Sequence, residues 1–127
     1  MNFVIAVALL SLIQFFYFGA LVAIARHRLD VPAPAMTGPA AFERLSRVQM
    51  NTLERLMLFL PLLWLAAQFW NPLWVAGVGV VFLVGRVVYW RAYVRQPEQR
   101  GVGNVLSMLP IGVLLLATLA GLFRTWV

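Results

Sequence analysis

The chain has 127 residues, of which 63% are hydrophobic and 11% charged, and its mean hydropathy is +0.89. A soluble domain of this size cannot bury so much apolar surface, because small domains hide only part of what the unfolded chain exposes. The composition therefore excludes a water-soluble globular domain and predicts that a bilayer covers the rest. Cysteine is absent, which excludes disulfides, a cysteine nucleophile and sulfur-ligated metals. We predict no metal site and no nucleic-acid partner.

The charged residues are few and unbalanced. Ten basic residues, all arginine, stand against four acidic ones, which gives a formal net charge of +6. Arginine stays charged when desolvated and presents a planar fork of donors to a carboxylate. The excess fits an anionic ligand or anionic lipid headgroups. A GC-rich bacterial coding sequence would also enrich arginine, so composition leaves the cause open.

Four apolar stretches are each long enough to cross about 30 Å of hydrocarbon. They are Phe3–Ala25, Met50–Phe69, Leu73–Tyr93 and Val105–Phe123. The first has no basic residue before its apolar run, and that run is too long for a signal peptide, so we expect it to be retained. The predicted fold class is an all-α membrane protein, a four-transmembrane-helix bundle forming a single domain over residues 1–127.

The connections between the spans contain the helix-breaking residues. Arg26 to Ser46 contains three prolines and should form a loop, Asn71-Pro72 a tight turn, and Arg95 to Asn104 the last connection. Basic residues crowd the first and third connections, and the second has none. The positive-inside rule then predicts that both basic loops are cytoplasmic and both termini outside. The compact chain, with arginine as its only basic residue, suggests a GC-rich bacterium, so we expect a bacterial inner membrane.

Several polar residues fall at membrane depth. On a helix continuing from Phe42 into the second span, Arg47, Asn51 and Glu54 follow at i, i+4 and i+7, which places them on one face. Arg86, Tyr89 and Tyr93 likewise share a face of the third span. Ionisable groups are costly in a bilayer and usually face the bundle interior or a wet cavity.

Two interpretations of these charges remain open at this point. Glu54 can neutralise Arg86 or Arg55 as a structural ion pair between helices. Alternatively, the surplus positive charge requires an anion that the chain does not supply. Glu54 is the only acid within the spans, against arginines at 47, 55, 86 and 100, and this imbalance favours the second interpretation.

Two segments carry a family resemblance. The run FERLSRVQMNTLE at 42–54, preceded by Thr37-Gly38-Pro39, and the run GRVVYWRAY at 85–93, followed by Arg100, are similar in type and spacing to the signature of the MAPEG family. These are the membrane-associated proteins in eicosanoid and glutathione metabolism. The resemblance extends from about Arg26 to Leu122 and is closest to the branch of microsomal glutathione transferases and cysteinyl-leukotriene synthase.

The resemblance implies a homotrimer with glutathione as co-substrate at the subunit interface. It implies that Arg100 stabilises the glutathione thiolate and that Arg86 supports the pocket. Arg26 and Gln49 would contact glutathione from the neighbouring subunit. The remaining glutathione-binding residues implied by the family are Arg47, Asn51, Glu54, Tyr89 and Tyr93. Arg55 departs from the family pattern, which commonly has an aromatic residue there, and this leaves the pocket shape and the substrate preference open.

The chemistry of these residues suits glutathione, which has two carboxylates for arginines and one ammonium for Glu54. A guanidinium near the thiol would lower its pKa from about 8.5 and raise the thiolate fraction. The expected reaction is conjugation to a lipophilic electrophile, or reduction of a lipid hydroperoxide, arriving from the membrane lipid. The alternative is a non-catalytic lipid-binding protein of the lipoxygenase-activating type. A channel subunit is disfavoured, because no second polar face marks a continuous path.

Overall fold

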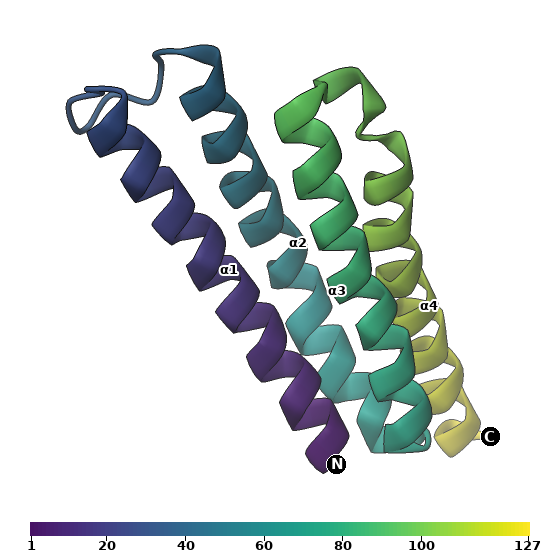
Figure 1. Cartoon of the computed structure of the whole chain (residues 1–127). Coiled ribbons are helices and arrows are strands. Elements are labelled where there is room, and N and C mark those ends of the chain that lie inside the picture. Colours follow the sequence, from purple (N-terminus) through teal and green to yellow (C-terminus); the bar gives the residue numbers. More distant parts are fainter.

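The computed structural model describes all residues 1–127 and consists of helices joined by short connections. The four long helices are α1 (Asn2–Arg28), α2 (Ala40–Phe69), α3 (Pro72–Arg95) and α4 (Gly101–Trp126), and a short 3-10 helix, η1 (Pro97–Gln99), precedes α4. Each long helix is long and apolar enough to cross a membrane. The predicted all-α, four-span architecture is confirmed (Figure 1).

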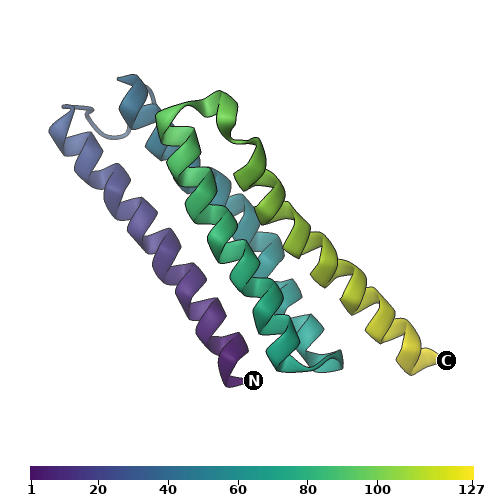
Figure 2. The same cartoon turned by 45° about the vertical axis from the view of Figure 1, so that its right-hand side comes forward.

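The helices alternate in direction, so the connections gather at two ends. The α1–α2 loop and η1 lie at one end, and the two termini and the α2–α3 turn lie at the other (Figures 1 and 2). We call the first the basic end, because most of the arginines lie in the helix turns that flank its two connections, or at Arg100 between η1 and α4, whereas the other end has only Arg124. The predicted clustering of both basic loops on one side is therefore a property of the fold.

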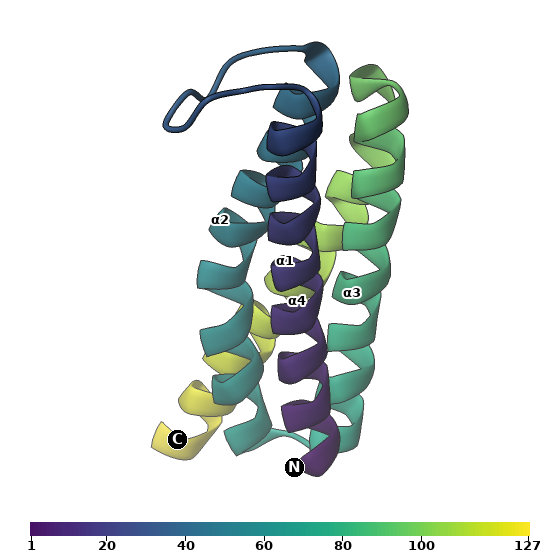
Figure 3. The same ribbon diagram turned by 60° about the vertical axis from the view of Figure 1, so that its left-hand side comes forward.

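The first connection is shorter than predicted. α1 continues to Arg28 and α2 begins at Ala40, so the loop spans only residues 29–39 (Figure 3). Val31 lies in the loop and Phe42 in the first turn of α2. Both are buried against the last turns of α1. This small apolar cluster holds the loop against the bundle and lets both helices extend beyond their apolar spans.

The contact between α3 and α4 brings two backbones together at glycines. A Cβ on Gly85 would lie 2.7 Å from the backbone carbon of Leu106, and one on Gly103 would overlap the backbone of Tyr89. Small residues at such crossings allow close helix packing in membranes. The close approach also sets Arg86, next to Gly85, directly opposite Ser107 of α4.

The main apolar core fills the bundle from its middle toward the end with the termini. Phe59 of α2 and Phe82 of α3 are fully buried and stacked, with ring centroids 3.9 Å apart. Many large apolar side chains point outward instead, as expected of spans that face lipid. Arg86 lies one helical turn from Phe82, so the polar site described below begins where this core ends.

Candidate functional site

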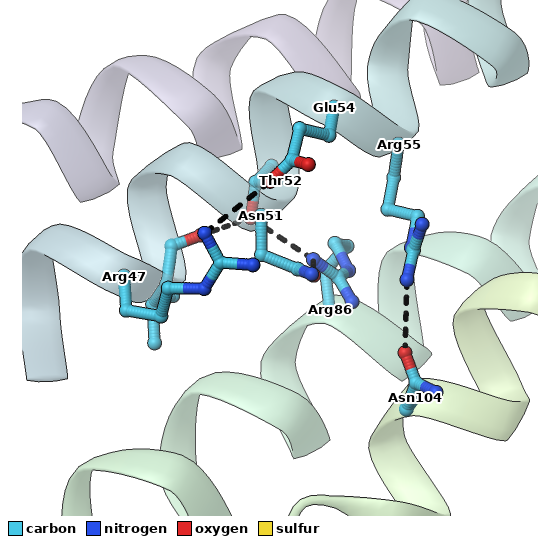
Figure 4. A network of polar contacts seen from close by, with 8 residues as sticks. Arg47, Asn51, Thr52, Glu54, Arg55, Arg86 and Asn104 are labelled. Atoms are coloured by element: carbon cyan, nitrogen blue, oxygen red, sulfur yellow. Dashed lines mark hydrogen bonds and ion pairs between the residues drawn. The ribbon is translucent and has the colours of Figure 1, made fainter.

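Arg86 is fully buried within the bundle and forms the centre of a polar network (Figure 4). Its Nη1 donates to Asn51 Oδ1 at 2.7 Å and to Thr52 Oγ1 at 3.2 Å, and its Nε donates to Ser107 Oγ at 2.9 Å. A single α3 side chain thereby ties α2 to α4. Hydrogen bonds from charged donors are stronger than neutral ones, so this network fixes the three helices in register.

The two hydroxyl groups of this network also donate hydrogen bonds to backbone carbonyls of their own helices. Thr52 Oγ1 donates to the Val48 carbonyl at 2.8 Å, and Ser107 Oγ donates to the Gly103 carbonyl at 2.8 Å. Each hydroxyl is therefore oriented to accept from the guanidinium. The ring of Tyr89 lies 4.5 Å from the guanidinium carbon of Arg86 and adds a cation–π contact.

No carboxylate neutralises Arg86. Its bonded partners are all neutral, and its Nη2 is buried without a partner. Glu54 instead pairs with Arg47, with 3.5 Å between Nη1 and Oε1, and both side chains are about half exposed at 52% and 53%. The hypothesis that Glu54 neutralises Arg86 or Arg55 is wrong, because Glu54 points out of the bundle on the face that it shares with Arg47 (Figure 4).

Two tyrosines continue the site toward the basic end. Tyr89 and Tyr93, one turn apart on α3, stack with ring centroids 5.5 Å apart. Tyr93 and Arg47 both line a cavity of about 500 Å³ between the start of α2 and the end of α3. Asn51 and Tyr89 are 6% and 3% exposed, so they form the inner part of the site, and Arg47, Glu54 and Tyr93 form its surface.

Arg26 and Gln49 do not join this face within one chain. Arg26 donates from Nη1 to the Ala35 carbonyl at 2.8 Å and supports the α1–α2 loop. The amide of Gln49 packs on the other side of α2, where a Cβ on Gly19 of α1 would lie 3.0 Å from its Nε2. Arg100, between η1 and α4, is exposed, and its Nη1 donates to the Pro97 carbonyl at 3.0 Å.

Sequence analysis predicts Asn51 as a site residue but not the two hydroxyl side chains that bond to Arg86. Thr52 and Ser107 are fully buried and bonded to Arg86, although neither residue type is unusual in a span. Asn104 also escaped notice, and its Oδ1 accepts from Arg55 Nη2 at 3.3 Å. A polar residue in an otherwise apolar stretch of α4, one turn beyond a glycine, was the available signal for Ser107.

Fold and site together define a class: a multi-pass membrane protein whose helical bundle holds an arginine-rich polar site near one end. Residues 4–120 match the MAPEG family. The chain is 37% identical over 116 residues to human microsomal glutathione S-transferase 2, covering 91% of this chain and 77% of that protein. It belongs to the MAPEG family.

Two further relatives come from a cyanobacterium and a mammal. A protein of Synechocystis sp. without an assigned function is 44% identical over 95 residues, covering 75% of this chain and 69% of that protein. Bovine leukotriene C4 synthase is 39% identical over 95 residues, covering 75% of this chain and 63% of that protein. The resemblance noted in the two sequence runs is thus confirmed at the level of the family.

Proposed function

We propose that this chain is a glutathione-dependent membrane transferase that activates the glutathione thiol for attack on a lipophilic electrophile. The observation that carries the proposal is the buried Arg86, bonded only to neutral partners, beneath a surface with Arg47, Glu54 and Tyr93. The names of the relatives, glutathione S-transferase and leukotriene C4 synthase, support the same reaction class.

The charges of the site fit glutathione as co-substrate. A peptide with two carboxylates and one ammonium needs more cationic than anionic contacts, and the site offers several arginines with Glu54 as its acid. In the proposal, the exposed Arg47 binds a carboxylate and Glu54 binds the ammonium. Since their mutual contact is long and half exposed, a ligand can replace it at small cost.

The remaining residues position the ligand. Tyr93 forms one wall of the 500 Å³ cavity, with Tyr89 and Asn51 behind it. Arg86 holds Asn51 in place from inside the bundle, at 2.7 Å. A pocket whose inner side chains are already fixed loses little conformational entropy when the ligand binds.

Arg100 is assigned to the thiol. It is exposed at the basic end, and its Nη1 bond to the Pro97 carbonyl leaves its other donors free to face a bound ligand. A guanidinium beside a thiol stabilises the thiolate, which is the nucleophile. The sulfur then forms a bond to the electrophilic carbon while the bond from that carbon to a leaving group or ring oxygen breaks. A leaving group departs with the electron pair, and an opened ring oxygen takes up a proton from water.

We also propose a peroxidase reaction at the same site. The thiolate would attack the outer oxygen of a lipid hydroperoxide and break the O–O bond, releasing the alcohol. The first sulfur would then carry a hydroxyl group. The thiol of a second glutathione would attack this sulfur, giving oxidised glutathione and water. The same activated sulfur serves both reactions, so the two activities should fall together when Arg100 is replaced.

The site of one chain is incomplete in this proposal, and a homotrimer completes it. Gln49 lies on the side of α2 that faces α1, away from the face of Arg47 and Glu54, and Arg26 lies near the end of α1, bonded to the α1–α2 loop. They would contact glutathione bound to a neighbouring subunit. The basic end is proposed to be cytoplasmic in a bacterial inner membrane, with both termini outside, following the distribution of arginines.

Thermal unfolding with and without glutathione tests the binding step. A ligand that binds only the folded state stabilises it by about 2.7 kcal/mol at a concentration 100 times its Kd. The purified wild-type protein and the Arg91→Gln variant, which removes an exposed arginine outside the cavity, should both be stabilised by millimolar glutathione. Arg47→Gln should lose about half of this shift, because an affinity about tenfold lower leaves about 1.4 kcal/mol at the same concentration. No shift in the wild type would contradict glutathione binding and favour the lipid-binding alternative.

A further inference from the structure

A second cluster of aromatic and basic residues lies at the end opposite the candidate site. Trp70, at the end of α2, donates from Nε1 to the Ala117 carbonyl of α4 at 2.7 Å. Arg124 of α4 donates from Nη2 to the Phe69 carbonyl at 3.3 Å, and its guanidinium carbon lies 4.7 Å from the Trp70 ring centroid. The exposed Arg124 side chain is thereby held against the α2–α3 turn.

A cavity of about 410 Å³ opens beside this cluster, and we call it the tryptophan pocket. It is lined by Trp70, Asn71, Trp74 and Ala117. The α2–α3 turn and the end of α4 meet here, where the membrane-spanning helices end (Figure 1). This is the depth at which lipid headgroups meet acyl chains, and tryptophan is enriched there.

Arg124 is held by the Phe69 carbonyl and the Trp70 ring, and no carboxylate pairs with it in the structure. Arg124 forms no ion pair, and the side-chain carboxylates at positions 30, 43, 54 and 98 all lie in the other half of the bundle or its connections. The first turn of α3 also begins at the pocket, where Asn71 caps it by accepting from the Leu73 amide at 2.9 Å. A helix N-terminus adds partial positive charge to that of the guanidinium.

An apolar pocket next to a cation that forms no ion pair matches an amphiphile with an anionic head. We propose that the tryptophan pocket binds a membrane phospholipid, with its phosphate beside Arg124 and the start of α3. The upper part of one acyl chain lies against Trp70 and Trp74. The phosphate supplies an anionic partner for Arg124, which forms no ion pair in the structure, and the aromatic rings supply the apolar surface.

Native mass spectrometry of delipidated protein in detergent tests this proposal. The protein is titrated with phosphatidylglycerol and, in parallel, with diacylglycerol carrying the same acyl chains but no phosphate. Wild-type protein should bind one phosphatidylglycerol about tenfold more tightly than diacylglycerol, the value of one charge-assisted contact. Arg124→Gln should abolish this preference, and Arg124→Lys should keep part of it.

Two further variants make the result specific to the pocket. Trp74→Ala should weaken binding of both lipids, because it removes the apolar wall and not the charge. Arg28→Gln removes an exposed arginine at the other end of the molecule and should bind like the wild type. If Arg124→Gln retains the tenfold preference, or if Arg28→Gln loses it equally, the lipid is bound elsewhere and the proposal is wrong.

Discussion

Replacing Arg86 by methionine should separate the structural role of this residue from its charge. The side chain is fully buried, and three of its hydrogen bonds reach α2 and α4. Methionine is unbranched and flexible, so Arg86→Met fills much of the same space without charge or donors. The change leaves one acceptor, Asn51 Oδ1, without its 2.7 Å partner.

The size of the effect follows from what each partner loses. A buried polar atom left unsatisfied costs about 1–3 kcal/mol. Thr52 and Ser107 lose less, since their hydroxyls keep their bonds to the Val48 and Gly103 carbonyls. Removing a buried cation that has no carboxylate also removes its desolvation penalty, which offsets part of the loss. Arg86→Met should therefore destabilise the fold by about 1–3 kcal/mol.

The double variant tests this reasoning. Asn51→Leu alone takes a partner from a buried cation and should cost about 3 kcal/mol or more. Arg86→Met combined with Asn51→Leu leaves neither group unsatisfied and should be more stable than either single variant. Unfolding in mixed micelles, followed by helical circular dichroism, measures each loss. If the two single losses simply add, the Arg86–Asn51 contact does not stabilise the bundle and the reasoning is refuted.

Four other substitutions have effects on stability that the same unfolding experiment measures. Gly103→Ala should destabilise the fold by about 1–3 kcal/mol, because the new Cβ would overlap the Tyr89 backbone. Gly112→Ala, on the same helix but with open space around it, should be neutral or stabilising by up to about 1 kcal/mol. Equal losses in these two variants would contradict the close α3–α4 packing. Arg47→Gln should change stability by less than about 1 kcal/mol, since its ion pair is half exposed, yet lower glutathione affinity about tenfold. Trp70→Phe should lower the free energy of unfolding by about 1 kcal/mol, because the hydrogen bond to the Ala117 carbonyl is lost. An unchanged free energy of unfolding would show that this bond does not stabilise the fold.

Hydropathy predicts the four spans because the bilayer requires long apolar helices, whatever the neighbouring contacts. Helix ends are less predictable from composition. Arg28 and Ala40 mark the true ends of the first loop because Val31 and Phe42 pack together, a tertiary contact that no local pattern reveals. Pro61 and Pro110 lie inside α2 and α4, which continue past them.

Helical spacing predicts which site residues share a face of one helix, but not which residues of different helices bond to each other. Arg47 and Glu54 share a face of α2 as their i, i+7 spacing indicates, and their ion pair follows from that. Which residues bond to Arg86 depends on how α3 meets α4 at Gly85, and this is set by packing between distant segments. For the same reason Thr52 and Ser107 could not be assigned from sequence. Their hydroxyls matter only because Arg86 lies between them.

The most direct test of the central proposal is the ultraviolet absorbance of the glutathione thiolate bound to the purified protein. Saturating glutathione should give a thiolate signal at neutral pH with the wild type, and S-methylglutathione, which has no thiol, should give none. Arg100→Ala should bind glutathione yet lose the thiolate signal and the conjugation rate together. If Arg100→Ala retains both, or if the wild type shows no thiolate at saturation, this chain does not activate glutathione in the proposed way.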